Sequence, residues 1–400
     1  MRTYRDLFRT PEYTPLFTVT SAQVAASTVS GLALGTLVYG TTRSPLLSAL
    51  SMFGGSFAQV LGATVLLSAA DRLPPRAALT GLALVFSAGT VVLALPGLPL
   101  WAVFAVVLGI GLAASLGGGV RFGLLNEILP KDGYLLGRSV LGMSVGVQQI
   151  IGFVAGGALM TALSPRGTLL TAAGLYLVAA IVARWGLTAR PPRAQGRPSP
   201  AQTWRTNRAL WSSGERRRLY LALWVPNGLI VGCESLYVAY DASNAGLLFA
   251  CAAAGMLTGD TLMGRFVPKR WRERLSAPLR LLLAVPYLVF LVHPSPPVAV
   301  AAVVLASAGY SAGLLLQERL MAVTPEEMSG QALGLQSSGV LTMQGVGAAI
   351  AGAVAQVTSA AAAMGVMAVA SVAVTLALAP GLRAGAAVEA RSSAPAGRAA

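Results

Sequence analysis

Long apolar runs recur along almost the whole chain of 400 residues, and they constrain its fold more than any other feature. A helix that crosses the hydrocarbon core of a bilayer needs about 20 mostly apolar residues. The first six runs of this kind are 15–39, 46–70, 77–95, 100–125, 140–163 and 169–187. The second six are 219–240, 245–264, 275–292, 298–316, 334–358 and 360–378. The sequence therefore predicts an all-α integral membrane protein with twelve transmembrane helices.

The composition agrees with this interpretation and argues against a string of soluble domains. Hydrophobic residues make up 55% of the chain, and only 11% of its residues are charged. In soluble globular domains, roughly a quarter of all residues are charged. The mean hydropathy is +0.69, which is the value of a chain that spends most of its length in lipid.

Residue types that serve metal, disulfide and nucleotide chemistry are scarce. Cys233, Cys251 and His293 are the only cysteines and histidine, which is too few for a zinc or iron centre or a disulfide framework. The only lysines, Lys131 and Lys269, lack the Gly-Lys-Ser/Thr context of a P-loop. We therefore expect no metal, no cofactor and no ATP-binding loop. We also expect no enzymatic activity, because no cluster of His, Asp or Glu marks a membrane interface.

The net charge of +15 could indicate a nucleic-acid partner or the positive-inside bias of membrane loops. With the N-terminus inside, only Arg43 and Arg166 of the 29 basic residues fall in outside loops. This bias supports both the span count and the orientation, and it removes the need for a nucleic-acid partner. We expect both termini to be cytoplasmic.

The charged stretches divide the chain into four parts. We predict a six-helix half over residues 1–187, a basic cytoplasmic linker over 188–218 and a second six-helix half over 219–380. Residues 381–400 are rich in Ala, Gly, Ser, Pro and Arg and are expected to form a disordered cytoplasmic tail.

The two halves share a weak internal repeat with an offset of 195 residues. The matched pairs are Pro130 and Pro325, Gln149 and Gln344, Gly152 and Gly347, and Gly157 and Gly352. Six spans are an even number of crossings, so the two halves have the same orientation in the membrane. The sequence therefore predicts two parallel six-helix repeats.

Three segments resemble the major facilitator superfamily, and most closely its bacterial multidrug, macrolide and siderophore exporter branch. In the loop after the second span, Asp71, Arg72 and Arg76 match the family pattern, whereas Leu67, Pro74 and Pro75 depart from it. In the fifth span, Gly152, Gly156 and Gly157 match a Gly-Pro-x-x-Gly-Gly element of exporters, with Phe153 in place of the proline. The segment 125–142 resembles the loop between the fourth and fifth spans of that branch.

The resemblance implies alternating access around a central substrate cavity in a bacterial inner membrane, and we expect the protein to act as a monomer. In this fold the first, fourth, seventh and tenth helices line the cavity. That placement favours Gln23, Asn227, Tyr237 and Tyr310 as substrate-cavity residues. The spacing of Gly152, Gly156 and Gly157 favours close helix packing.

Two acids inside the spans are candidates for proton coupling. Glu234 lies about fifteen residues into the seventh span, and an ionised group there is costly unless it faces a cavity or a partner. Its alternative role is a structural hydrogen bond between helices. Asp260 lies in the eighth span, where it would carry protons, attract cationic substrates or pair with Arg265 or another loop arginine at the inner end of the helix.

Charged residues at the cytoplasmic helix ends are candidates for a gate. They are Asp71, Arg72, Arg76, Arg121, Glu127 and Arg138. Such charges can form a network that closes one side of a transporter in one state and opens in the other. The alternative is ordinary positive-inside arginine with incidental acids.

Together these features predict a secondary transporter for the proton-coupled efflux of small hydrophobic or amphipathic molecules. The rival within transport is an importer or a lipid- or siderophore-type facilitator of the same fold. A membrane enzyme and a non-transporting sensor are the other classes, and neither has a supporting feature.

Overall fold

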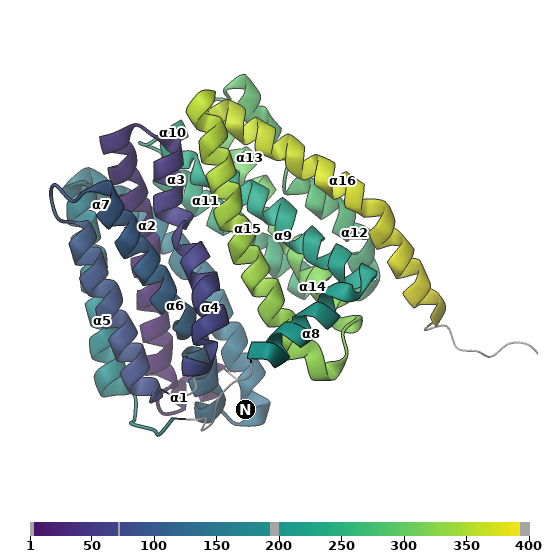
Figure 1. The fold of residues 1–400 in the computed structure, drawn as a ribbon, viewed down its shortest axis with the longest axis horizontal. Helices are drawn as coiled ribbons and strands as arrows, with labels where there is room; N and C mark the ends of the chain where they lie inside the picture. Colours follow the sequence, from purple (N-terminus) through teal and green to yellow (C-terminus); the bar gives the residue numbers. More distant parts are fainter. Residues whose placement is uncertain (1–3, 71–72, 193–199, 393–400) are drawn as a thin grey trace, which may run out of the picture.

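The computed structural model describes residues 4–70, 73–192 and 200–392, and helices make up nearly all of them (Figure 1). The elements of the first half are α1 Tyr4–Arg9, α2 Tyr13–Thr42, α3 Pro45–Phe53, α4 Gly55–Ala70, α5 Pro75–Leu93, α6 Leu100–Ile128 and α7 Lys131–Gly186. Helix α7 is two helices joined at a kink, where Ser164 adopts φ 72° and ψ 164° and Pro165 follows. It contains the fifth and sixth predicted spans.

The second half has more elements because several of its spans are interrupted. They are α8 Pro200–Ser212, α9 Gly214–Ser235, α10 Tyr237–Tyr240, α11 Ala245–Thr261, η1 Leu262–Phe266, α12 Lys269–Leu282, η2 Val285–Val292, α13 Pro296–Ala308, η3 Gly309–Ser311, α14 Ala312–Ala322, η4 Glu326–Met328, α15 Ser329–Val357 and α16 Ala360–Ser392. Within the described residues, 11 helical stretches are long and apolar enough to cross a membrane, and the kinked α7 supplies two crossings. The predicted all-α membrane fold is therefore confirmed.

We call the two ends of the helix bundle the basic face and the opposite face. The basic face carries α1 and α8, which lie at the bottom of Figure 1, and the turns at 129–130, 267–268 and 323–328. The opposite face carries the turns at 43–44, 94–99, 241–244, 293–295 and 358–359. The two six-helix groups, α2 to α7 and α9 to α16, stand beside one another (Figure 1).

The internal repeat reappears in the helix packing. Gly152 of α7 lies against Thr28 of α2, and its repeat partner Gly347 of α15 lies against the backbone of Gly228 in α9. Across the two halves, Gly157 faces the first turn of α11, and Gly352 faces Leu46 at the start of α3. Equivalent glycines thus make equivalent contacts in two parallel repeats.

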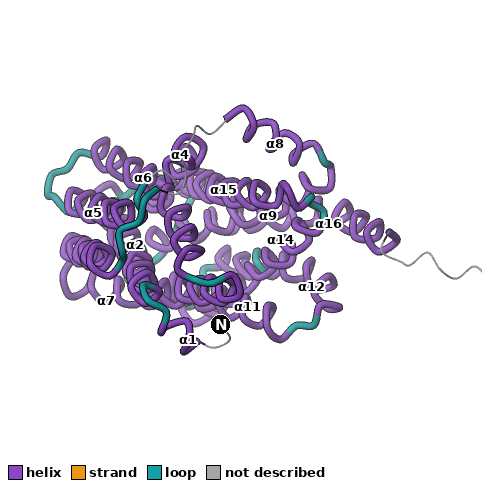
Figure 2. The backbone as a smooth tube through the Cα atoms, turned by 90° about the horizontal axis from the view of Figure 1, so that it is seen from below, coloured by secondary structure: helices purple, strands orange, loops and turns teal. Residues whose placement is uncertain are grey.

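The predicted linker and the predicted tail both contain helix. Within the linker 188–218, α8 packs beside α9 and α15 and runs along the edge of the second half (Figure 2). The predicted disorder of 381–400 is wrong for its first part, because α16 continues to Ser392. Composition misled the prediction, since Ala, Leu, Arg and Glu are strong helix formers. Residues 393–400 lie outside the described chain.

Two exposed tryptophans stand at opposite ends of the bundle. Trp101 is 75% exposed and lies in the first turn of α6, near the opposite face. Trp185 is 78% exposed and lies in the last turn of α7, near the basic face. Tryptophan is enriched at both membrane–water interfaces, where its amphipathic ring sits at the headgroup level. The positions of these two rings fit a bilayer whose core covers the helices between them.

Candidate functional site

Glu234 is a buried acid at an interruption of its helix. Helix α9 is buried over most of its length beyond Leu219, contains Pro226 and ends at Ser235, one residue beyond Glu234. The next residue, Leu236, turns the chain before α10 resumes. Glu234 is 8% exposed, and the Tyr310 hydroxyl donates a hydrogen bond of 3.1 Å to its Oε1. Among the described side chains, no cation forms an ion pair with this carboxyl group.

The partner of Glu234 also lies at an interrupted helix. Tyr310 belongs to η3, a single 3₁₀ turn between α13 and α14. The adjacent Gly309 packs so closely on the backbone of Leu283 that a Cβ there would clash with it. Short 3₁₀ pieces inside a longer helix often mark functional positions. The sequence thus brings two non-regular turns, each with a polar side chain, to the same depth of the bundle.

An aromatic cluster surrounds this pair and extends to the other half. The hydroxyls of Tyr237 and Tyr287 are hydrogen-bonded to one another, and both side chains are fully buried. The Phe249 ring meets Tyr237 edge-on at 4.8 Å and stacks on Phe153 of α7 at 4.7 Å. These ring contacts connect α10, which follows Glu234, to α7 of the first half.

The structure brings together two of the four predicted cavity residues. Tyr237 and Tyr310 join the Glu234 cluster, as described above. Asn227 lies about two helical turns from Glu234 in α9 and accepts a hydrogen bond of 3.3 Å from the Gln344 amide of α15. Gln23 is buried in α2, with 8% of its surface exposed.

Asp260 occupies a different part of the second half. It is half-buried in α11, two residues before the π-helical turn η1. Within the described residues it forms no ion pair with Arg265, which is exposed. The structure therefore shows no contact that supports an ion pair between Asp260 and Arg265.

The predicted gating residues do not form one network in the described part of the chain. Asp71 and Arg72 lie outside the described residues. The Arg138 guanidinium lies 5.2 Å from the centre of the Phe122 ring. Arg121 lies seven residues inside the end of α6, and its buried Nε has no hydrogen-bond partner. Arg76 is half-buried in the first turn of α5.

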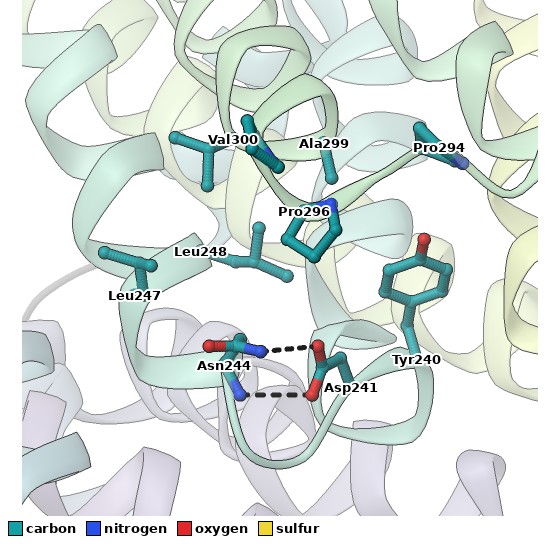
Figure 3. A pocket seen from close by; sticks show the side chains of 10 residues that line it. Tyr240, Asp241, Asn244, Leu247, Leu248, Pro294, Pro296, Ala299 and Val300 are labelled. Atoms are coloured by element: carbon teal, nitrogen blue, oxygen red, sulfur yellow. Dashed lines mark hydrogen bonds between the residues drawn. The ribbon is translucent and has the colours of Figure 1, made fainter.

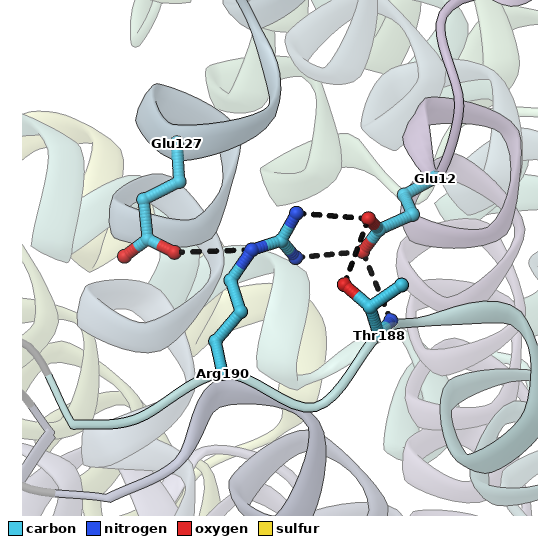
Figure 4. A network of polar contacts seen from close by, with 4 residues as sticks. All are labelled: Glu12, Glu127, Thr188 and Arg190. Atoms are coloured by element: carbon cyan, nitrogen blue, oxygen red, sulfur yellow. Dashed lines mark hydrogen bonds and ion pairs between the residues drawn. The ribbon is translucent and has the colours of Figure 1, made fainter.

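Glu127 instead belongs to a polar network that sequence reasoning missed (Figure 4). Arg190, which follows α7, holds Glu12 through two hydrogen bonds of 2.7 and 2.8 Å. The backbone N–H and the hydroxyl of Thr188 donate to the same carboxylate at 3.0 and 2.9 Å. The Arg190 Nε lies 3.6 Å from Glu127 of α6. No local signal indicated this pairing, because Glu12 and Arg190 are 178 residues apart.

The predicted packing glycines lie at helix contacts. A Cβ on Gly152 would come within 2.9 Å of Thr28, and one on Gly156 would meet Val29 and Leu32 at about van der Waals distance. Gly157 faces Gly246 across the two halves. These placements agree with a role in close helix approach.

Comparisons with known proteins decide the family. Residues 16–240 match the Major Facilitator Superfamily, and this region covers more than half of the chain. This chain belongs to the major facilitator superfamily. Among curated proteins, none matches its sequence.

Solved superfamily structures share the fold across nearly the whole chain. A POT family transporter in complex with 5-aminolevulinic acid has a TM-score of 0.74 and 13% identity, covering 92% of this chain and 95% of its own. A point mutant of the nucleoside transporter NupG has a TM-score of 0.74 and 12% identity, with coverages of 92% and 99%. A bacterial homologue of the human lysosomal transporter Spinster, inward-facing and unoccupied, has a TM-score of 0.73 and 14% identity, with coverages of 95% and 96%. At these identities the likeness shows the transporter fold alone.

Within this superfamily fold, the Glu234 site occupies the less regular half. The sequence match ends at Tyr240, directly after the α9–α10 interruption. The interruptions at η2 and η3 lie beyond it. Glu234 and Tyr310, the hydrogen-bonded pair of this half, both lie where its helices are broken.

Proposed function

We propose that this chain is a proton-coupled exporter of small hydrophobic or amphipathic molecules and that Glu234 carries the proton. The observation that supports this proposal best is the buried Glu234 carboxyl group with Tyr310 as its hydrogen-bond partner. An ionisable group inside a membrane is costly, and such groups commonly mark ion and proton pathways.

The arrangement suits a group that alternates between two protonation states. A protonated carboxyl is neutral and tolerates an apolar surrounding. An ionised carboxyl needs a donor, and the Tyr310 hydroxyl can supply one. Because each partner sits at a helix interruption, a small change in either turn would alter their contact. Asp260 is our second candidate for coupling.

The orientation and the direction of transport are also part of the proposal. The basic face would be cytoplasmic, because all but two of the 29 basic residues lie at that end by the span assignment. Export is supported by the exporter-like element at Gly152, Gly156 and Gly157. The buried aromatic side chains near Glu234 suit an apolar or amphipathic cargo.

An importer or a lipid- or siderophore-type facilitator is the alternative. Two sequence departures favour it: Phe153 replaces the proline of the exporter element, and Pro74 and Pro75 alter the loop after the second span. Both alternatives use alternating access, so the direction of net flux separates them.

The test is transport by the purified protein in liposomes with an imposed pH gradient. Glu234→Gln keeps the size of the side chain and removes its ability to exchange a proton. We expect gradient-driven flux to fall at least tenfold, while exchange of cargo at equal pH on both sides continues. Tyr310→Phe removes the hydrogen bond and should reduce gradient-driven flux to a smaller extent.

Glu318→Gln provides the matched control, because Glu318 is an exposed acid of α14 in the same half. It should leave both modes of transport unchanged. Full gradient-driven flux in Glu234→Gln would contradict proton coupling through Glu234 and make Asp260 the next variant. Flux that runs only toward the side of the basic face would favour the importer.

A further inference from the structure

A cavity of ≈ 290 Å³ opens at the opposite face, within the second half (Figure 3). One wall comes from the end of α10, the turn 241–244 and the first turn of α11, and the other from Pro294 and the first residues of α13. Both walls belong to the same half, so the cavity does not depend on how the two halves meet. It is separate from the Glu234 cluster, which lies deeper in the bundle.

The walls of the cavity are held in place before any ligand arrives. Pro294, Pro296 and Pro297 form one wall, and each proline ring fixes its own φ angle. On the other wall, the Asp241 carboxylate accepts hydrogen bonds from the Ser243 and Asn244 backbones and side chains. Ligand sites are usually largely pre-formed in this way.

The charge in the cavity has one sign. Leu248, Val300 and the prolines give it an apolar lining, Tyr240 adds a ring, and Asp241 is its acid. None of the residues that line it is basic. Burial alone would raise the pKa of Asp241, but the hydrogen bonds from Ser243 and Asn244 outweigh burial and lower the pKa. The carboxylate is therefore ionised at neutral pH.

The hydrogen bonds around Asp241 leave room for a further interaction. Oδ1 accepts three of the four bonds, whereas Oδ2 accepts only the 2.8 Å bond from the Asn244 amide. A carboxylate oxygen offers two lone pairs, so Oδ2 retains acceptor capacity. The neutral donors do not cancel the negative charge.

We propose that this cavity binds a small organic cation with an apolar body. The cation would lie against Asp241, with the Tyr240 ring available for a cation–π contact, and the apolar body would pack on Val300 and the prolines. The volume lies just under the range of about 300–1,000 Å³ found for drug-sized ligands, so the occupant is a small one. This inference goes beyond transport through the central site and does not depend on it.

The test compares two probes of equal shape, (4-hydroxyphenyl)trimethylammonium and its uncharged isostere 4-tert-butylphenol. The reporter is Leu247→Cys in the full chain with Cys233→Ser and Cys251→Ser, because Leu247 lines the cavity and is 50% exposed. Each probe should slow alkylation of this cysteine by a maleimide. The cation should protect it at about tenfold lower concentration than the isostere, because only the cation gains a charge–charge attraction.

Two further variants locate the effect. Asp241→Asn should weaken the cation about tenfold and leave the isostere unchanged, and Val300→Trp should fill the cavity and abolish protection by both probes. Glu318→Gln removes an equal charge elsewhere in this half and should change neither probe. Glu234→Gln should also change neither, which separates this cavity from the proposed transport site.

Three results would overturn the proposal. The first is equal protection by the two probes, and the second is undiminished cation binding in Asp241→Asn. The third is protection that survives Val300→Trp and disappears in Glu234→Gln, which would place the cation in the central site. Thermal unfolding of each variant identifies any that fail to fold.

Discussion

At the scale of single residues, Glu12 and Arg190 tie the start of the linker to the first half (Figure 4). Burial acts to raise the pKa of Glu12, but the hydrogen bonds from Arg190 and Thr188 outweigh it and lower the pKa below its usual value. A carboxyl whose pKa is lowered on folding stabilises the folded state above its unfolded pKa of about 4.3. That contribution is lost as the pH falls through the lower pKa of the folded state.

Glu12→Gln should therefore loosen residues 187–190 at pH 7. The neutral amide loses the charge of a bidentate pair, which for a partly exposed ion pair is worth about 1 kcal/mol, or roughly fivefold in the equilibrium constant for local opening. Hydrogen exchange of the backbone amides in this segment measures this equilibrium. Arg190→Lys should have an intermediate effect, because lysine cannot form the planar two-bond contact.

The pH dependence supplies the control for this prediction. After correction for intrinsic exchange, wild-type protection should approach that of Glu12→Gln as the pH falls from about 4.3 through the lower pKa of the folded state, while the variant stays constant. Equal protection of wild type and both variants at pH 7 would show that the network does not anchor the segment.

At the scale of helices, the closest contact between α9 and α15 depends on two glycines. A Cβ on Gly347 would come closer than 3.0 Å to the Gly228 backbone, whereas one on Gly31 of α2 would meet nothing within 4 Å. Gly347→Ala should therefore separate the helices and destabilise the protein by roughly 1–3 kcal/mol. Gly31→Ala should be neutral or slightly stabilising, since alanine favours a helix more than glycine does.

Thermal unfolding of the two purified variants checks this prediction. The same substitution in two membrane helices controls for the general effect of replacing glycine. Equal stability of Gly347→Ala and Gly31→Ala would mean that α9 and α15 can separate without cost.

The sequence predicted the spans well and their interruptions poorly. Apolar length alone locates a membrane helix, because lipid requires every backbone group to bond within the segment. It does not reveal where the helix breaks, as at Leu236 and Gly309, because such breaks depend on neighbours such as Leu283. Glu234 stood out as a lone acid in an apolar run, while Tyr287 did not, since tyrosine is common in spans.

At the scale of the whole molecule, contacts between the halves occur at the opposite face. The Ser44 hydroxyl donates a 2.8 Å hydrogen bond to the Gln356 amide oxygen, and the Tyr39 hydroxyl reaches the carbonyl of Ala239 at 3.5 Å. Leu46 of α3 packs against Gly352 of α15. Alternating access by relative motion of the two halves requires these contacts to open in each cycle.

A cross-link at this position should stop transport. We expect Ser44→Cys with Gln356→Cys, in a chain with Cys233→Ser and Cys251→Ser, to lose transport on oxidation and regain it on reduction. Each single cysteine variant should be insensitive to the oxidant. Continued transport by the fully cross-linked protein would mean that these contacts stay closed throughout the cycle.

The linker is fastened at both of its ends, and this sets a mechanical limit. Arg190 holds one end to the first half through Glu12. Near the other end, Arg216 donates to the Val323 carbonyl of the second half and to the carbonyls of Ala209 and Leu210 within the linker. Only eight peptide steps separate Pro192 from Pro200. A fully extended chain of that length spans at most about 29 Å. While both fastenings hold, the linker is a tether that limits how far the two anchor points can move apart at the basic face.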